Sequence, residues 1–103
     1  MPVAFIQEFR IEDRSTTNYD AVADRLRDIV PDGGLIHTAG FDDEAGVFRI
    51  FDVWETREHG ERFMQEHLQP ILEEMMASRP ELQPPTREAW YELHDVMAGV
   101  MTS

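Results

Sequence analysis

Cysteine is absent from the 103 residues of this sequence. Its absence excludes disulfide bridges, thiolate nucleophiles and thiolate metal sites together. A long apolar run is also missing, because no segment approaches the roughly 20 apolar residues that a membrane-spanning helix needs. The N-terminus has neither the basic start nor the apolar stretch of a signal peptide. We therefore expect a cytoplasmic protein that does not enter the membrane.

Basic residues are scarce. The sequence contains nine basic residues, all arginine, and 21 aspartate and glutamate residues, which gives a formal charge of −12 at pH 7. A field of this sign repels phosphate backbones and anionic lipid headgroups. Nucleic acid and membrane surfaces are therefore not expected partners, and the plain interpretation of the acidity is a solvated surface. The length and the ordinary shares of charged and apolar residues fit one globular domain, 1–103.

Hydrophobic periodicity predicts six elements. They are a strand from Val3 to Phe9, a helix from Tyr19 to Val30, strands from Leu35 to Phe41 and from Val47 to Trp54, a helix from Thr56 to Met76, and a strand from Glu88 to Val96. Thr56 is the expected N-cap of the second helix. Pro70 has no N–H for the carbonyl of Glu66, so it should kink or split that helix. Residues 97–103 are expected to form a flexible tail.

The order β-α-β-β-α-β predicts a ferredoxin-like α+β fold, with both helices on one face of a four-stranded antiparallel sheet. The strand 47–54 is apolar on both faces and is broken only by Arg49 and Asp52, on opposite faces. The helices cover one face only, and two sheets packed face to face would cover the other. We therefore expect a homodimer. At least one of the two charges should be buried and paired, across the dimer or with a terminal residue.

A longer motif joins the third strand to the second helix: Phe51-Asp52-Val53-Trp54-Glu55-Thr56-Arg57-Glu58, continued by Phe63 and by Leu68-Gln69-Pro70-Ile71-Leu72. This motif resembles the dimeric α+β barrel superfamily, which contains the antibiotic biosynthesis monooxygenases. The resemblance implies a dimeric barrel with a pocket between sheet and helices. Members include cofactor-free oxygenases of aromatic polyketides, haem-degrading enzymes, lactone isomerases and small proteins without an assigned activity.

The haem-degrading branch is disfavoured residue by residue. That branch has an asparagine near the end of the first strand, and a tryptophan and a histidine ten residues apart on the second helix. Matching the Val53-Trp54 strand end places Phe9, Phe63 and Glu73 at those three positions. All three differ, and we expect no cofactor. Trp54 itself matches a strand-end tryptophan common in the superfamily, and it is expected to pack in the core or to bind substrate.

Three residues are candidate catalytic residues. His67 falls inside the apolar stripe of the second helix, and His37 lies on the second strand. An imidazole can take a proton from an acidic phenol or enol near neutral pH. Gln7, between Phe5 and Phe9, would donate to a developing oxyanion. The alternative is that His67 and Gln7 are core residues satisfied by their neighbours.

Together these residues predict one pocket and two possible functions. If the Gln7 face meets the helices, one apolar cavity should be lined by Phe5, Gln7, Phe9, Phe63 and His67. No metal is expected, because His59 and His67 are eight residues apart and cannot act as an i, i+4 pair. The resemblance implies a small cofactor-independent monooxygenase or isomerase that acts on an aromatic or enolisable molecule. The alternative is a non-catalytic dimeric module that binds a small apolar ligand or only itself.

Overall fold

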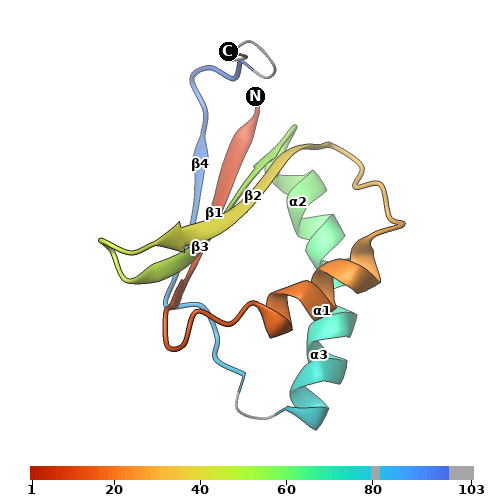
Figure 1. The fold of residues 1–103 in the computed structure, drawn as a ribbon. Helices are drawn as coiled ribbons and strands as arrows, with labels where there is room; N and C mark the ends of the chain where they lie inside the picture. The colour runs from red at the N-terminus through yellow and green to blue at the C-terminus, as the bar shows by residue number, and fades with distance from the viewer. Residues whose placement is uncertain (80–81, 98–103) are drawn as a thin grey trace.

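The computed structural model describes residues 1–79 and 82–97. Its elements are β1 (Val3–Arg10), α1 (Thr17–Leu26), β2 (Gly34–Asp42), β3 (Val47–Trp54), α2 (Arg57–Phe63), the π-helical turn η1 (Met64–Leu68), α3 (Gln69–Ser78) and β4 (Arg87–Glu92). The strands form one antiparallel sheet in the order β2-β3-β1-β4, and the helices lie on one side of it (Figure 1). The predicted ferredoxin-like α+β fold is confirmed. Most of the predicted tail lies outside the described residues.

Two predicted boundaries are wrong, each for a local reason. α1 ends at Leu26, and Val30 is 91% exposed. Val30 precedes a proline, which disfavours helical backbone, and the chain turns instead through a bond from the Ile29 N–H to the Leu26 carbonyl. β4 ends at Glu92 rather than at residue 96. Its partner β1 begins at Val3, opposite Glu92, so further residues have almost no strand to pair with.

The second helix is divided at the predicted proline. α2 and α3 are separated by η1, in which the Gln69 N–H donates to the carbonyl of Met64, five residues earlier. Pro70 lies in the first turn of α3, where a missing N–H costs least. The predicted N-cap is also confirmed, because Thr56 Oγ1 accepts a hydrogen bond from the His59 N–H at 3.2 Å.

The register decides which sheet face meets the helices. Directly opposed residues in antiparallel strands project to the same side. Val3 is paired with Trp54, and Phe5 with Trp90. The core on this face consists of Val3, Phe5 and Trp54, packed against Phe63, Met64 and Trp90. Gln7, two residues after Phe5, therefore faces the helices.

The other face, which we call the open face, carries no helix or strand among residues 1–79 and 82–97. Arg49 lies on it and pairs within the chain, with Glu8 at 2.7 Å and with Asp42 at 2.8 Å. Arg49 also holds the pKa of Glu8 below its usual value, through a hydrogen bond. Asp52, on the helix face, pairs with His37. Both charges are thus paired as expected, but their partners are on the same chain and are not terminal residues.

Candidate functional site

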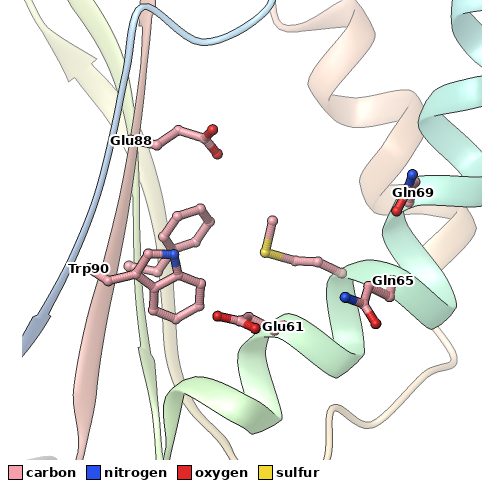
Figure 2. Close-up of a pocket in the computed structure, with 7 residues that line it drawn as sticks. Glu61, Gln65, Gln69, Glu88 and Trp90 are labelled. Carbon is pink, nitrogen blue, oxygen red and sulfur yellow. The ribbon is translucent and has the colours of Figure 1, made fainter.

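A hollow of about 380 Å³ lies between the sheet and the helices (Figure 2). We call it the larger hollow. The sheet contributes Phe5, Glu88 and Trp90, and the helical side contributes Glu61, Met64, Gln65 and Gln69. None of the helices in residues 1–79 and 82–97 is long and apolar enough to span a bilayer. The volume of the larger hollow falls within the range of small-molecule pockets.

The wall of the larger hollow is aromatic. Phe5 and Trp90 are opposed on neighbouring strands, and their rings stack with centroids 4.2 Å apart and planes 21° apart. The guanidinium of Arg57 lies 5.0 Å from the centroid of the Trp90 ring. Gly60 lets α2 come close, because a Cβ there would lie 2.8 Å from Trp90 Cη2 and 3.1 Å from Trp54 Cδ1. A flat apolar surface therefore faces the helices.

The polar groups of the larger hollow are carboxylates and amides. Glu88 lies on the sheet beside the aromatic wall, and Glu61 lies across from it on the helical side (Figure 2). Gln7 Nε2 donates to Glu88 Oε2 at 2.9 Å, and the two residues are opposed in the sheet. The amides of Gln65 and Gln69 complete the polar set. An oriented carboxylate beside stacked rings can hold or accept a proton of a bound aromatic molecule.

Trp54 packs in the core beside the larger hollow. It is 5% exposed, and its ring lies 5.4 Å from that of Phe63. Its Nε1–H has no hydrogen-bond partner among the described residues. A buried donor left unpaired costs about 1–3 kcal/mol, so an acceptor reaching it would be favoured. Trp54 is not a lining residue of the hollow.

The five predicted cavity residues do not line one hollow. His67 and Phe63 border a second, smaller hollow of about 90 Å³, lined by Val30, Asp32, His59, Arg62, Phe63, Glu66 and His67. The two hollows share no residue. Phe63 and His67 are an i, i+4 pair on one helix face, with ring centroids 5.4 Å apart, and Phe63 packs against the core cluster. Phe9, opposite Phe48, lines neither hollow. Within the described residues, no three metal-ligating side chains form a metal-holding group.

No family model and no curated protein matches this chain. Three solved structures are similar in fold. The first, from Chloroflexus aurantiacus J-10-fl, is described as an antibiotic biosynthesis monooxygenase; it is 15% identical, the match covers 94% of this chain and 97% of that one, and the TM-score is 0.64. The second is the cofactor-independent oxygenase SnoaB from Streptomyces nogalater, which is 16% identical over 94% of this chain and 97% of that one, with a TM-score of 0.62. The third is Rv0793 from Mycobacterium tuberculosis, which is 18% identical over 93% of this chain and 98% of that one, with a TM-score of 0.65. The chain has the fold of the antibiotic biosynthesis monooxygenases. The resemblance seen in the sequence is confirmed at the level of the fold.

On this antibiotic biosynthesis monooxygenase fold, His37 takes part in a chain of three side chains. Its Nδ1 lies 2.5 Å from Asp52 Oδ1, and its Nε2 lies 2.6 Å from the hydroxyl of Tyr19. The hydrogen bond to Asp52 raises the pKa of His37. Burial, with the negative charges of Asp52 and Asp20, raises the pKa of Tyr19. This group lies beside β2 and borders neither hollow.

Sequence reasoning assigned neither Glu88 nor Tyr19 to a site, and it predicted Asp52 only as a charge that could be buried and paired. In the hairpin, Asp42 is paired with Val47, so residues at equal distances from the turn lie opposite each other. His37 and Asp52 are each five residues from these positions and are therefore paired. The predicted hairpin therefore contained the signal for that pair. Tyr19 and Glu88 depend on how a helix and a distant strand come to lie against the sheet, and the spacing of residues carries no signal for that.

Proposed function

We propose that this chain is a cofactor-independent monooxygenase-like enzyme that acts on an aromatic or enolisable small molecule in the larger hollow. The observation that carries the proposal is the Glu88 carboxylate, held by Gln7 at 2.9 Å beside the Phe5–Trp90 stack. Stacked rings offer a flat surface to an aromatic ligand. The fold shared with SnoaB, described as a cofactor-independent oxygenase, supports the same class.

Glu88 is the proposed base. His67, the base favoured from the sequence, borders the smaller hollow, so the carboxylate of the larger hollow takes that role. Proton transfer is efficient only when the two pKa values are close. A carboxylate therefore selects substrates whose anion is strongly delocalised, such as polycyclic phenols conjugated to a carbonyl. Gln7 positions the carboxylate, and Gln65 and Gln69 bind polar substituents.

The reaction needs no external reductant. Glu88 removes a proton from an activated methylene carbon, and the resulting carbanion gives one electron to dioxygen. The radical pair combines to form a C–O bond, and the hydroperoxide loses water to leave a carbonyl. In sum, CH2 and O2 become C=O and H2O, and the substrate carbon supplies every electron.

We also propose that the molecule is a homodimer joined through the open face. Ile6 and Phe51 are opposed there and partly exposed, and no described helix covers them. Exposed apolar sheet surface of this kind marks an interface. A second copy of the same face fits it, because Arg49 and Arg87 together balance the carboxylates of Glu8 and Asp42 and leave the face without strong charge.

Oxygen uptake with a panel of anthrones and polycyclic phenols tests the proposed function. Wild-type protein should turn over members of the panel and should show quenching of tryptophan fluorescence on binding. Glu88→Gln should lower kcat about 100-fold with quenching retained, because a general base contributes on that order. Glu92→Gln is the matched control, since Glu92 lies on the same strand and face but outside the hollow. Unchanged kcat in Glu88→Gln would refute the base, and quenching without turnover would favour a binding module.

A further inference from the structure

We propose that Tyr19, His37 and Asp52 form a second reactive centre, in which the tyrosine hydroxyl accepts an acyl group from small aryl esters or thioesters and His37 is its general base. The centre is separate from the proposed oxygenase site. It shares no residue with the larger hollow, and α1, β2 and β3 supply one residue each.

The connectivity of this centre is that of a nucleophile–histidine–carboxylate triad. The His37 Nδ1–H donates to Asp52 Oδ1 at 2.5 Å, which leaves Nε2 as the acceptor of the Tyr19 O–H at 2.6 Å. In such a triad the carboxylate fixes the tautomer and orientation of the imidazole, and the imidazole takes the proton of the attacking oxygen. Here a phenol stands where serine is usual.

The three side chains are held in place by the fold. His37 and Asp52 are directly opposed on neighbouring strands, and the Asp52 side chain is only 17% exposed. The Tyr19 ring lies parallel to that of His37, within 3°, and packs edge-on against Phe48 with centroids 5.5 Å apart. The His37 side chain is 57% exposed, so a small molecule can reach the centre from solvent.

Electrostatics keep the phenol protonated at rest while strengthening its base. Burial, Asp52 on β3 and Asp20 on α1 raise the pKa of Tyr19. The hydrogen bond to Asp52 raises the pKa of His37, so the imidazole holds a proton more firmly. A triad nucleophile is activated in this manner: its proton leaves as the new bond forms, and no free anion is needed beforehand.

The chemistry of the phenol sets the class of acyl donor. Tyr19 Oη forms a bond to the carbonyl carbon, the bond from that carbon to the leaving group breaks, and the phenolic proton passes through His37 Nε2 to the leaving group. The product is an aryl ester, so the leaving group must be no more basic than a phenol, whose pKa is about 10. Aryl esters and thioesters meet this condition, whereas alkyl esters and amides do not. Water, deprotonated by His37, then bonds to the acyl carbon; the bond from that carbon to Tyr19 Oη breaks, the acid leaves, and His37 returns the proton to the phenolate.

The test uses the full chain and p-nitrophenyl acetate. The sequence has no cysteine and no lysine to compete, and it has two tyrosines, of which Tyr91 is 45% exposed and serves as an internal control. We expect a burst of one nitrophenolate per chain and an acetyl group on Tyr19, located by mass spectrometry, that forms faster than on Tyr91. Tyr19→Phe should abolish the burst, and Tyr91→Phe should leave it unchanged. His37→Gln should slow it about 100-fold, with His59→Gln as the histidine control.

The pH profile separates catalysis from a structural role. The acylation rate should rise with pH through the pKa of His37, because only the neutral imidazole accepts the proton. Asp52, a positioning residue, raises that pKa, so Asp52→Asn should slow acylation and move the midpoint to lower pH. A burst that persists in Tyr19→Phe, equal labelling of Tyr91, or a wild-type rate in His37→Gln would each overturn the proposal. Circular dichroism shows whether His37→Gln disturbs the fold. If it does, the wild-type protein alone tests the proposal, and an acylation rate that stays constant between about pH 5 and 8 overturns the proposal.

Discussion

At the scale of single residues, Gly60 controls how closely α2 approaches the sheet. A Cβ at this position would lie 2.8 Å from Trp90 and 3.1 Å from Trp54. Both rings are stiff, and Trp90 is backed by Phe5, so neither can move away cheaply. Overpacking a core costs about 1–3 kcal/mol, while alanine gains about 1 kcal/mol in helix propensity over glycine. We expect Gly60→Ala to lower the free energy of unfolding by about 1 kcal/mol.

Urea denaturation checks this prediction, with Gly40→Ala as the control. No atom lies within 4 Å of a Cβ built at Gly40, so that variant should lose no stability. All variants should be compared at one protein concentration, because the stability of the proposed dimer would depend on it. A midpoint for Gly60→Ala at or above that of the wild type would show that the tryptophans yield to the added methyl group.

Among the candidate site residues, sequence reasoning left open which sheet face carries Gln7, and the register of β1 puts this residue on the face that meets the helices. Sequence reasoning could not assign His67 to a hollow. The stripe Phe63 to Met76 was treated as one helical face, but the π turn contains one more residue than an α turn and changes the direction of the side chains after it. The local signal, Pro70, was visible, whereas the direction of the rotation depends on packing against the sheet.

At the scale of elements, the cap of α2 is the clearest case of a boundary set by one side chain. Thr56 Oγ1 accepts the His59 N–H and also lies 2.7 Å from His59 Nδ1. Removing such a cap typically costs about 1 kcal/mol. We expect Thr56→Ala to lower stability by about that amount, measured by urea denaturation. Thr16→Ala is the control, because Thr16 precedes α1 without a side-chain cap bond. Equal losses in both variants would contradict the capping role.

Element types were more predictable than element ends. The alternation in β1 and the apolar run of β3 are local properties, and both strands form as expected. The end of β4 depends on where its partner β1 begins, and the end of α1 depends on a turn that forms before Pro31. A boundary set by a partner in space leaves only a faint trace in the sequence of the element itself.

At the scale of the whole molecule, the most informative feature of the sequence was that β3 is apolar on both faces. One side meets the helices through Trp54, and the other side carries Phe51 and Val53 onto the open face. The prediction of a ferredoxin-like sheet with one covered face is confirmed. The homodimer remains a prediction, because it concerns contacts between chains.

A charge placed on the open face should separate the two copies. Ile6 lies between Phe51 and Ala89 there. In a two-fold interface the changed residue occurs twice, and each chain already carries a net charge of −12. We expect light scattering to give wild-type protein a mass near twice 12.0 kDa, and Ile6→Glu a mass near 12.0 kDa. Val30→Glu makes the same change at a residue that is 91% exposed, so it should keep the dimer mass. Wild-type protein at 12.0 kDa at micromolar concentration, or an Ile6→Glu protein that stays dimeric, would show that the copies do not meet through this face.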